Sequence, residues 1–199
     1  MKTLKQYLTE RLIIKKTSYN YSPKTREELK EIIKRRIKQE GNEVDLTDID
    51  VSNITDMSEL FQFLDFNGDI STWDVSKVTD MSYTFSGCES FNQNISQWDV
   101  SKVTKMEGMF YGCKAFNQDI SSWDVSNVTN MSYMFYGCEA FNQDISSWDV
   151  SNVTDMNRMF FDCKEFNQDI STWDVTKVKN SKFIFFDCNI EEKYKPHFK

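Results

Sequence analysis

The stretch FNQDISSWDVSNVTNMSYMFYGCEA, residues 116–140, is followed at once by FNQDISSWDVSNVTDMNRMFFDCKE, residues 141–165. Fifteen of the first sixteen letters recur in place, so the chain repeats every 25 residues. Periods of 20–50 residues are typical of solenoids, propellers and repeat arrays, and a propeller blade needs about 40 residues or more. The repeat therefore predicts a stacked solenoid.

The register of the repeat is set by tryptophan and cysteine. A degenerate first unit begins at Ile49, where Ile stands in the place of Trp, and is one residue shorter than the others. The later units carry these residues at a constant spacing: Trp73, Trp98, Trp123, Trp148, Trp173 and Cys88, Cys113, Cys138, Cys163, Cys188.

The residue pattern within each unit predicts a strand followed by a helix. Residues 122–126 read as a strand whose Trp123 and Val125 point inward, because side chains alternate along a strand. After Thr129, an expected N-cap, an apolar stripe with the i, i+3, i+4, i+7 spacing of an amphipathic helix runs from Met131 to Cys138. The expected fold is an α/β solenoid, a leucine-rich-repeat-like stack of strand-helix units of about 25 residues with a parallel sheet. The side chains predicted to face the core of one unit are Trp123, Val125, Val128, Met131, Met134, Phe135, Cys138, Phe141 and Ile145.

Three regions follow from the limits of the repeat. Residues 1–48 are expected to form a helical N-terminal cap or leader, residues 49–188 a six-unit repeat solenoid, and residues 189–199 a C-terminal cap or tail. Within the leader, Thr25-x-x-Glu28 is a helix-start signal and Gly41 a stop. An earlier helix is expected from residue 3 onward.

Charge is divided unevenly between these regions. The net charge is -7. Residues 1–41 contain twelve Lys/Arg and five Asp/Glu, whereas residues 42–199 contain twelve and twenty-six. A basic cluster in the leader could form a solvated outer face, dock onto a larger assembly or bind a polyanion. It consists of Lys34, Arg35, Arg36 and Lys38.

A column of aspartates is the first candidate contact surface. The five residues, on the open face of the expected sheet, are Asp74, Asp99, Asp124, Asp149 and Asp174. Two carboxylates about 5 Å apart repel each other by roughly 0.8 kcal/mol even in bulk water, so the column needs compensation. Local backbone hydrogen bonds, nearby Lys77, Lys102 and Lys177, a basic protein partner or a bound cation could each supply it.

Enzyme activity finds little support in the sequence. His197 is the single histidine and lies two residues from the end of the sequence given, which argues against His-dependent nucleophilic catalysis. The five cysteines share one repeat position and are expected to be small buried hydrophobes rather than disulfides or zinc ligands. No cofactor, metal site or catalytic residue is therefore expected.

Some positions vary from unit to unit while the apolar letters stay constant. Exposed aromatic and charged side chains that vary on a constant frame favour protein recognition. These positions are Lys105, Glu107, Tyr111, Tyr133, Tyr136, Arg158 and Phe161.

The pattern FNQDISSWDVSNVTNMSYMF closely resembles the 25-residue repeat of BspA-like bacterial surface proteins, which also occurs in mycoplasma lipoproteins, over residues 49–188. The resemblance implies a leucine-rich-repeat-like solenoid and proteins that bind other proteins or adhere to hosts. Similar repeats occur in phage-encoded and intracellular proteins. The first residues show no signal peptide or lipidated-cysteine context, so an intracellular or virion-associated location is expected over the cell surface.

These observations predict a non-enzymatic protein-protein interaction or adhesion module that presents a rigid repeat surface. The alternative is a structural component of a virion or larger assembly, docked through the N-terminal helices. No transmembrane segment is expected, since no apolar run is long enough to cross a bilayer. Nucleic acid is an unexpected partner because the acidic body would repel it.

Overall fold

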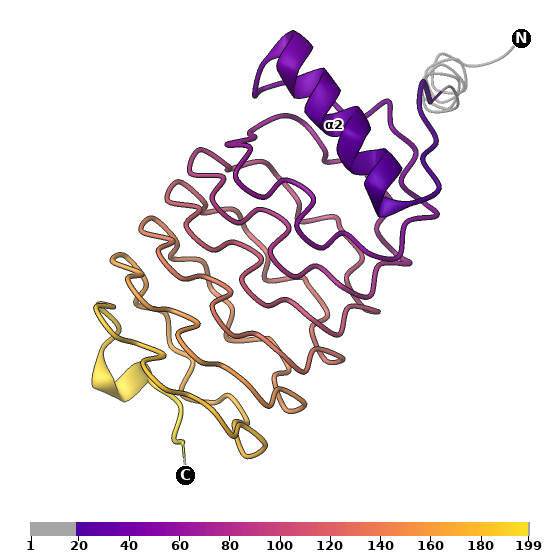
Figure 1. The fold of residues 1–199 in the computed structure, drawn as a ribbon. Helices are drawn as coiled ribbons and strands as arrows, with labels where there is room; N and C mark the ends of the chain where they lie inside the picture. Colours follow the sequence, from indigo (N-terminus) through magenta and orange to yellow (C-terminus); the bar gives the residue numbers. More distant parts are fainter. Residues whose placement is uncertain (1–18, 199) are drawn as a thin grey trace, which may run out of the picture.

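The computed structural model describes residues 19–198. The chain winds into a stack of coils, one for each repeat, with helix α2, Arg26–Glu40, lying across the end that contains the first coil (Figure 1). A single turn of 3-10 helix, η1, Glu192–Tyr194, lies at the other end. The helix expected from residue 3 onward lies outside the described residues. The six coils begin at Ile49, Trp73, Trp98, Trp123, Trp148 and Trp173.

The predicted strand-helix units are wrong. Residues 122–126 and residues 131–138 form turns and irregular backbone, not a strand and a helix. Throughout residues 19–198, sheet-like pairing is confined to isolated parallel bridges, such as the one between Asp80 and Lys105. The chain is therefore a stack of turns and not an α/β leucine-rich-repeat-like solenoid with a parallel sheet.

Turns close where the strand was expected. The side chain of Asp124 accepts a hydrogen bond from the backbone N–H of Ser126, with 3.1 Å between N and Oδ1. Immediately afterwards the N–H of Val128 donates to the carbonyl of Val125 at 2.9 Å. Aspartate commonly bonds the backbone two residues further on and so favours a turn. Trp123 and Val125 still face inward, because a turn at this place also alternates the side chains between core and solvent.

Left-handed backbone prevents the expected helix. Tyr133 has φ 58° and Gly137 has φ 68°, whereas an α-helix needs negative φ at every residue. The N–H groups of these two residues do not close helical turns. They donate to the next coil, to the carbonyls of Asn157 and Phe161, each at 2.8 Å.

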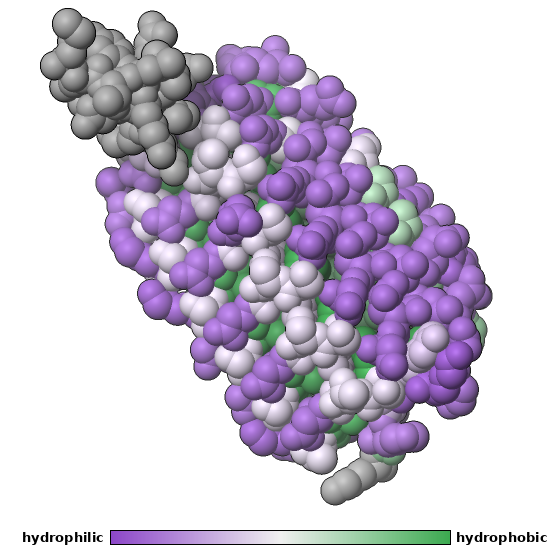
Figure 2. All heavy atoms as spheres, turned by 180° about the vertical axis from the view of Figure 1, so that it is seen from behind, coloured by the Kyte–Doolittle hydropathy of each residue, from purple (hydrophilic) through white to green (hydrophobic). Residues whose placement is uncertain are grey.

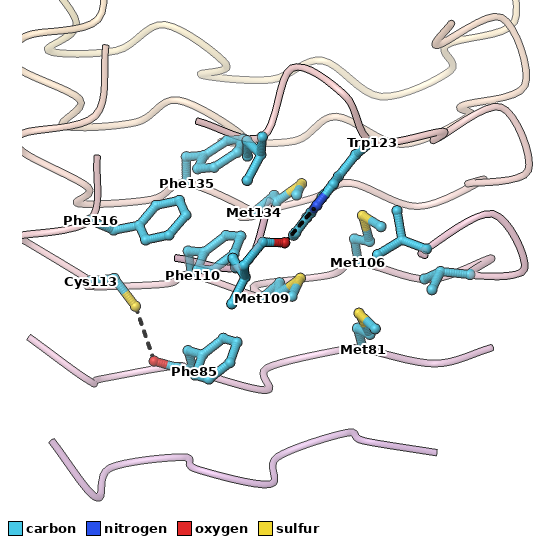
Figure 3. Close-up of a cluster of buried hydrophobic side chains, with 14 of the residues drawn as sticks. Met81, Phe85, Met106, Met109, Phe110, Cys113, Phe116, Trp123, Met134 and Phe135 are labelled. Atoms are coloured by element: carbon cyan, nitrogen blue, oxygen red, sulfur yellow. Dashed lines mark hydrogen bonds between the residues drawn. The ribbon is translucent and has the colours of Figure 1, made fainter. Parts of the chain in front are cut away.

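Stacked apolar columns fill the interior of the coils (Figure 3). Phe85 and Phe110, from successive coils, lie 5.7 Å apart between ring centroids. Indole nitrogens satisfy buried carbonyls 27 or 28 residues earlier in the chain; Trp123 Nε1 lies 3.2 Å from the Ile95 oxygen. The nine side chains predicted to face the core of one unit are confirmed as buried: Trp123, Val125, Val128, Met131, Met134, Phe135, Cys138, Phe141 and Ile145.

Helix α2 covers the first end of this core. The Thr25 side chain accepts from the N–H of Glu28, and the N–H of Gly41 donates to the Ile37 carbonyl, so both predicted helix signals are confirmed. The buried side chains of Leu29 and Ile33 belong to the same apolar cluster as the coils. Burial of these two side chains closes the stack at the first coil.

Candidate functional site

The predicted aspartate column lies along the stack in exposed positions. Each carboxylate accepts a hydrogen bond from the backbone N–H two residues further on, with 3.0–3.1 Å between N and Oδ1. The open strand face expected around the column is absent from residues 19–198, because the five aspartates close turns and do not lie on strands. Contact with a partner stays a prediction for the column, which comprises Asp74, Asp99, Asp124, Asp149 and Asp174.

Local hydrogen bonding compensates the repulsion within this column. The hydroxyl and the backbone N–H of Ser101 lower the pKa of Asp99. Lysine plays a smaller part than expected, because Lys177 Nζ donates to the side-chain oxygen of Asn152 at 2.7 Å. Of the explanations open at the level of sequence, the geometry favours backbone and hydroxyl hydrogen bonds.

Across residues 19–198, no three His, Cys, Asp or Glu side chains gather closely enough to hold a metal ion. None of the helical segments in that range has the length and the apolar character that a membrane crossing requires.

The basic cluster of α2 is partly engaged within the chain. Arg36 Nη1 lies 3.0 Å from Asp48 Oδ1, and the same guanidinium pairs with Glu40. The Arg35 guanidinium lies 5.5 Å from the ring centroid of Tyr21. Lys34, Arg35 and Lys38 are exposed. Arg36 thus joins α2 to the following segment, and the other three side chains of the cluster remain on the surface of the helix.

A row of stacked aromatic side chains runs along one side of the last coils. Successive ring centroids lie 4.6, 4.6 and 4.8 Å apart, with interplanar angles of 8°, 6° and 20°. Rows of like hydropathy along the stack are also visible on the face shown in Figure 2, as expected when equivalent side chains lie above one another. The first three rings are half-buried and the fourth is exposed. We call this the aromatic row: Tyr111, Tyr136, Phe161 and Phe186.

A hydrogen-bonded network flanks the aromatic row. Arg158 Nη1 donates to the Tyr133 hydroxyl at 3.1 Å, and the Arg158 guanidinium lies 4.9 Å from the ring centroid of Phe183. Two coils earlier, the Tyr83 hydroxyl donates to Glu107 Oε1 at 2.6 Å. Burial and this carboxylate raise the pKa of Tyr83. The network fixes the orientation of half-buried polar groups beside a row of rings.

The variable positions identified in the sequence are brought together, with one exception. Lys105 pairs instead with Asp80, with 3.0 Å between Nζ and Oδ2. Sequence reasoning missed Phe183 and Phe186, which are 54% and 55% exposed. Each lies 25 residues after a variable position, Arg158 or Phe161, and that spacing could have identified them. The residues brought together are Glu107, Tyr111, Tyr133, Tyr136, Arg158 and Phe161.

The five cysteines form a column of free thiols, of which four are buried and Cys188 is half-buried. Cys113 Sγ lies 3.1 Å from the Phe85 carbonyl oxygen, and the thiols of the neighbouring coils make the equivalent contact (Figure 3). Burial raises the pKa of Cys88 to about 12 and the pKa of Cys113 well above its ordinary value. A buried thiol that stays protonated is a poor nucleophile, so this column is structural.

A protein-family model described as "Mycoplasma protein of unknown function, DUF285" matches residues 28–138 and residues 118–195. The two matches together take in most of α2, all six coils and η1. No curated protein and no solved structure matches the chain.

Proposed function

We propose that this chain, which belongs to the DUF285 family of Mycoplasma proteins of unknown function, is a protein-binding module that presents a rigid repeat surface. One observation carries the proposal. Half-exposed and exposed aromatic side chains stack in the aromatic row beside a hydrogen-bonded arginine and tyrosine network. Tyr, Phe and Arg are enriched at the centres of protein interfaces.

The aromatic row suits recognition because its side chains are already ordered. Each ring rests on the ring of the next coil, so binding would restrict few additional torsions. Arg158 is held by Tyr133 and Phe183 in the free chain. A preordered arginine among rings can pair with a partner carboxylate or stack on a partner ring at low entropic cost.

We further propose that the module is not an enzyme. The aspartates of the column lie in repeated, nearly equal surroundings, whereas acid-base catalysis needs carboxyl groups whose environments differ. The buried thiols have raised pKa values, and His197 is the single histidine of the sequence given. These features support binding over catalysis.

The compartment and the wider role are proposals as well. The resemblance of the repeat to BspA-like surface proteins supports adhesion as one use of a binding surface. Location inside the cell or in a virion is the compartment that we propose. Subcellular fractionation of the source organism with an antibody against the chain tests that expectation, which recovery in the surface fraction contradicts.

The binding proposal is tested by affinity capture with quantitative mass spectrometry. The full chain is compared with a Tyr136→Ser, Arg158→Ala double variant and with an Asp124→Asn, Asp149→Asn double variant, each verified as folded by circular dichroism. We expect the aromatic-row variant to lose a specific partner by about tenfold or more and the aspartate variant to retain it.

Other outcomes separate the alternatives. Loss of the partner in the aspartate variant alone moves the contact surface to the aspartate column. Capture that is unchanged in both variants but lost after Lys34→Glu and Arg35→Glu supports docking through the N-terminal helices, as in a structural component. Absence of any saturable partner overturns the proposal.

A further inference from the structure

Neighbouring coils are joined by a regular ladder of backbone hydrogen bonds. In the fifth coil, N–H groups at alternate residues donate to carbonyls of the sixth, with 2.8–3.0 Å between N and O. Within this ladder the direction is constant from coil to coil, from the N–H of one coil to the carbonyl of the next, whereas other inter-coil bonds, such as that from the N–H of Lys179 to the carbonyl of Thr154, run the opposite way. The donors are Met156, Arg158, Phe160 and Asp162, and their acceptors are Asn180, Lys182, Ile184 and Phe186.

The sixth coil has the same four donors and no seventh coil beside it within the described chain. In residues 19–198, no acceptor is found for these N–H groups. Each lies 25 residues after a paired donor, so each N–H points along the stack axis, where a further coil would offer its carbonyl. We call residues 181–187 the end rung; its donors are Ser181, Phe183, Phe185 and Asp187.

The C-terminal segment covers chiefly the other half of this coil, although Lys195 Nζ lies 5.8 Å from the ring centroid of Phe185. The N–H of Ile170 donates to the carbonyl of Tyr194 at 3.0 Å, and Ile190 is buried against the core. Trp173 and Val175 are consequently 5% and 6% exposed. The end rung is not shielded in the same way, since Phe183 and Phe186 have more than half of their surface exposed.

The end rung together with the residues that lead into it is basic on an acidic body. Residues 177–187 contain three lysines and one aspartate. That aspartate, Asp187, pairs with Lys164 of the preceding coil. Lys177, Lys179 and Lys182 are exposed. Three exposed cations around a line of backbone donors favour an acidic partner.

We propose that the end rung binds an extended acidic segment of another protein, whose alternate carbonyls accept from the four N–H groups. Addition of an extended peptide to an open backbone edge is a general recognition mode in which main-chain hydrogen bonds supply affinity and side chains supply specificity. An apolar side chain of the segment continues the aromatic row over Phe186, and its carboxylates lie near Lys179 and Lys182. This inference rests on the proposed protein-binding function and gives it a site and a partner chemistry.

A second copy of the chain suits the end rung poorly. Two copies meeting end to end at this edge would oppose donors with donors. If two copies stacked in the same direction, the end rung of one would have to contact the first coil of the other. That coil is covered by α2 through Leu29 and Ile33. An acidic peptide segment meets both requirements of the edge, carbonyl acceptors and negative charge.

Hydrogen exchange of the full chain tests the premise. Amide protons of Met156, Arg158, Phe160 and Asp162 are expected to be protected, whereas those of Ser181, Phe183, Phe185 and Asp187 are expected to exchange about a hundredfold faster or more. Equal protection of both sets would show that the edge is already occupied. That result overturns the proposal. It does so also where the protection grows with protein concentration, because a second copy of the chain then occupies the edge.

Selection from phage-displayed random twelve-residue peptides against the full chain tests the ligand. We expect enriched peptides to be acidic, with apolar residues at alternate positions, and to protect the four end-rung amides when added as synthetic peptides. Phe186→Ser is expected to weaken binding about tenfold and Lys182→Glu about fivefold. Phe63→Ser is the matched control, because Phe63 is 74% exposed on the first coil, and it should leave binding unchanged.

Failure of this inference differs from failure of the proposed function. No enriched peptide, enrichment of basic peptides, or equal binding to Phe186→Ser, Lys182→Glu and the unmodified chain overturns the end-rung proposal. Partner capture through Tyr136 and Arg158 can succeed in each of those cases. Conversely, peptide binding at the end rung with no captured partner overturns the role of the aromatic row alone.

Discussion

At the scale of single residues, backbone conformation decides the fold more than side-chain pattern does. Two equivalent places in every coil take positive φ, with Asp65 as a third in the first coil, and glycine occupies only some of them; Tyr133 and Asp162 have φ 58° and 61°. The glycines before three of the cysteines were a visible signal, but an aromatic residue in the left-handed region was not. The apolar spacing was therefore read as a helix, although it correctly identified the buried side chains.

Gly137→Ala isolates the cost of the left-handed conformation. A Cβ at this position would meet only the Gly112 backbone, at 3.7 Å, so steric conflict is absent and the strain at φ 68° remains. We expect the free energy of unfolding to fall by about 1 kcal/mol in urea titrations. Gly68→Ala is the contrast: its Cβ would lie 1.9 Å from the Val44 carbonyl oxygen, and it should cost several times more. Equal costs would refute the argument.

The thiol column predicts a loss of stability in alkali. Burial raises the folded pKa of Cys88 to about 12 and that of Cys138 well above its ordinary value, whereas thiols of the unfolded chain ionise near pH 8.5. Above that pH the unfolded state releases protons that the folded state retains. The free energy of unfolding should therefore fall as pH rises, by up to about 1.4 kcal/mol per pH unit for each thiol. Cys138→Ala should reduce the slope between pH 8.5 and 10.5, and an unchanged slope contradicts the prediction.

At the scale of elements, the sequence was informative about α2 and misleading about the coils. Thr25, Glu28 and Gly41 identify the ends of α2, because capping depends on a few local residue types. The coils depend on hydrogen bonds between residues 24 or 25 positions apart. No local pattern distinguishes such pairing from a strand or a helix. Asp-x-Ser, which closes turns at several places in each unit, was the available clue.

Truncation of the helix face tests the role of α2 as a cap. Leu29 is fully buried against the first coil, so Leu29→Ala should lower the free energy of unfolding by about 2–5 kcal/mol. Lys34→Ala, on the exposed face of the same helix, should change it by less than about 0.5 kcal/mol. If thermal unfolding shows similar midpoints for the two variants, α2 does not stabilise the stack.

At the scale of the whole molecule, the candidate surface arises only because coils are in register. The aromatic row contains one side chain from each of four coils. The sequence showed Tyr111, Tyr136 and Phe161 as variable positions without showing that their rings touch. Phe183 and Phe186 could not be judged exposed from the sequence, because their exposure depends on where the C-terminal segment lies. The repeat therefore predicts which side chains form the surface, and not how far along the stack they are exposed.

Removal of one whole coil should preserve the fold. Deletion of residues 124–148 joins Trp123 to Asp149 and keeps every position in register. We expect a cooperatively folded chain with a lower free energy of unfolding and a smaller denaturant m-value, because nearest-neighbour interfaces add along a stack. Deletion of residues 124–135 removes fewer residues but breaks the register, and it should abolish cooperative unfolding. Loss of folding in the first variant alone would contradict this view.

The direction of the inter-coil hydrogen bonds has a mechanical consequence. Bonds such as that from Tyr133 to Asn157 run along the stack axis, so tension applied between the two ends loads one interface at a time. Under such tension the chain should peel coil by coil, and each release of 25 residues should lengthen it by about 80 Å. A stack of this kind lengthens in small steps under tension and can re-wind between them, so it dissipates an applied force gradually.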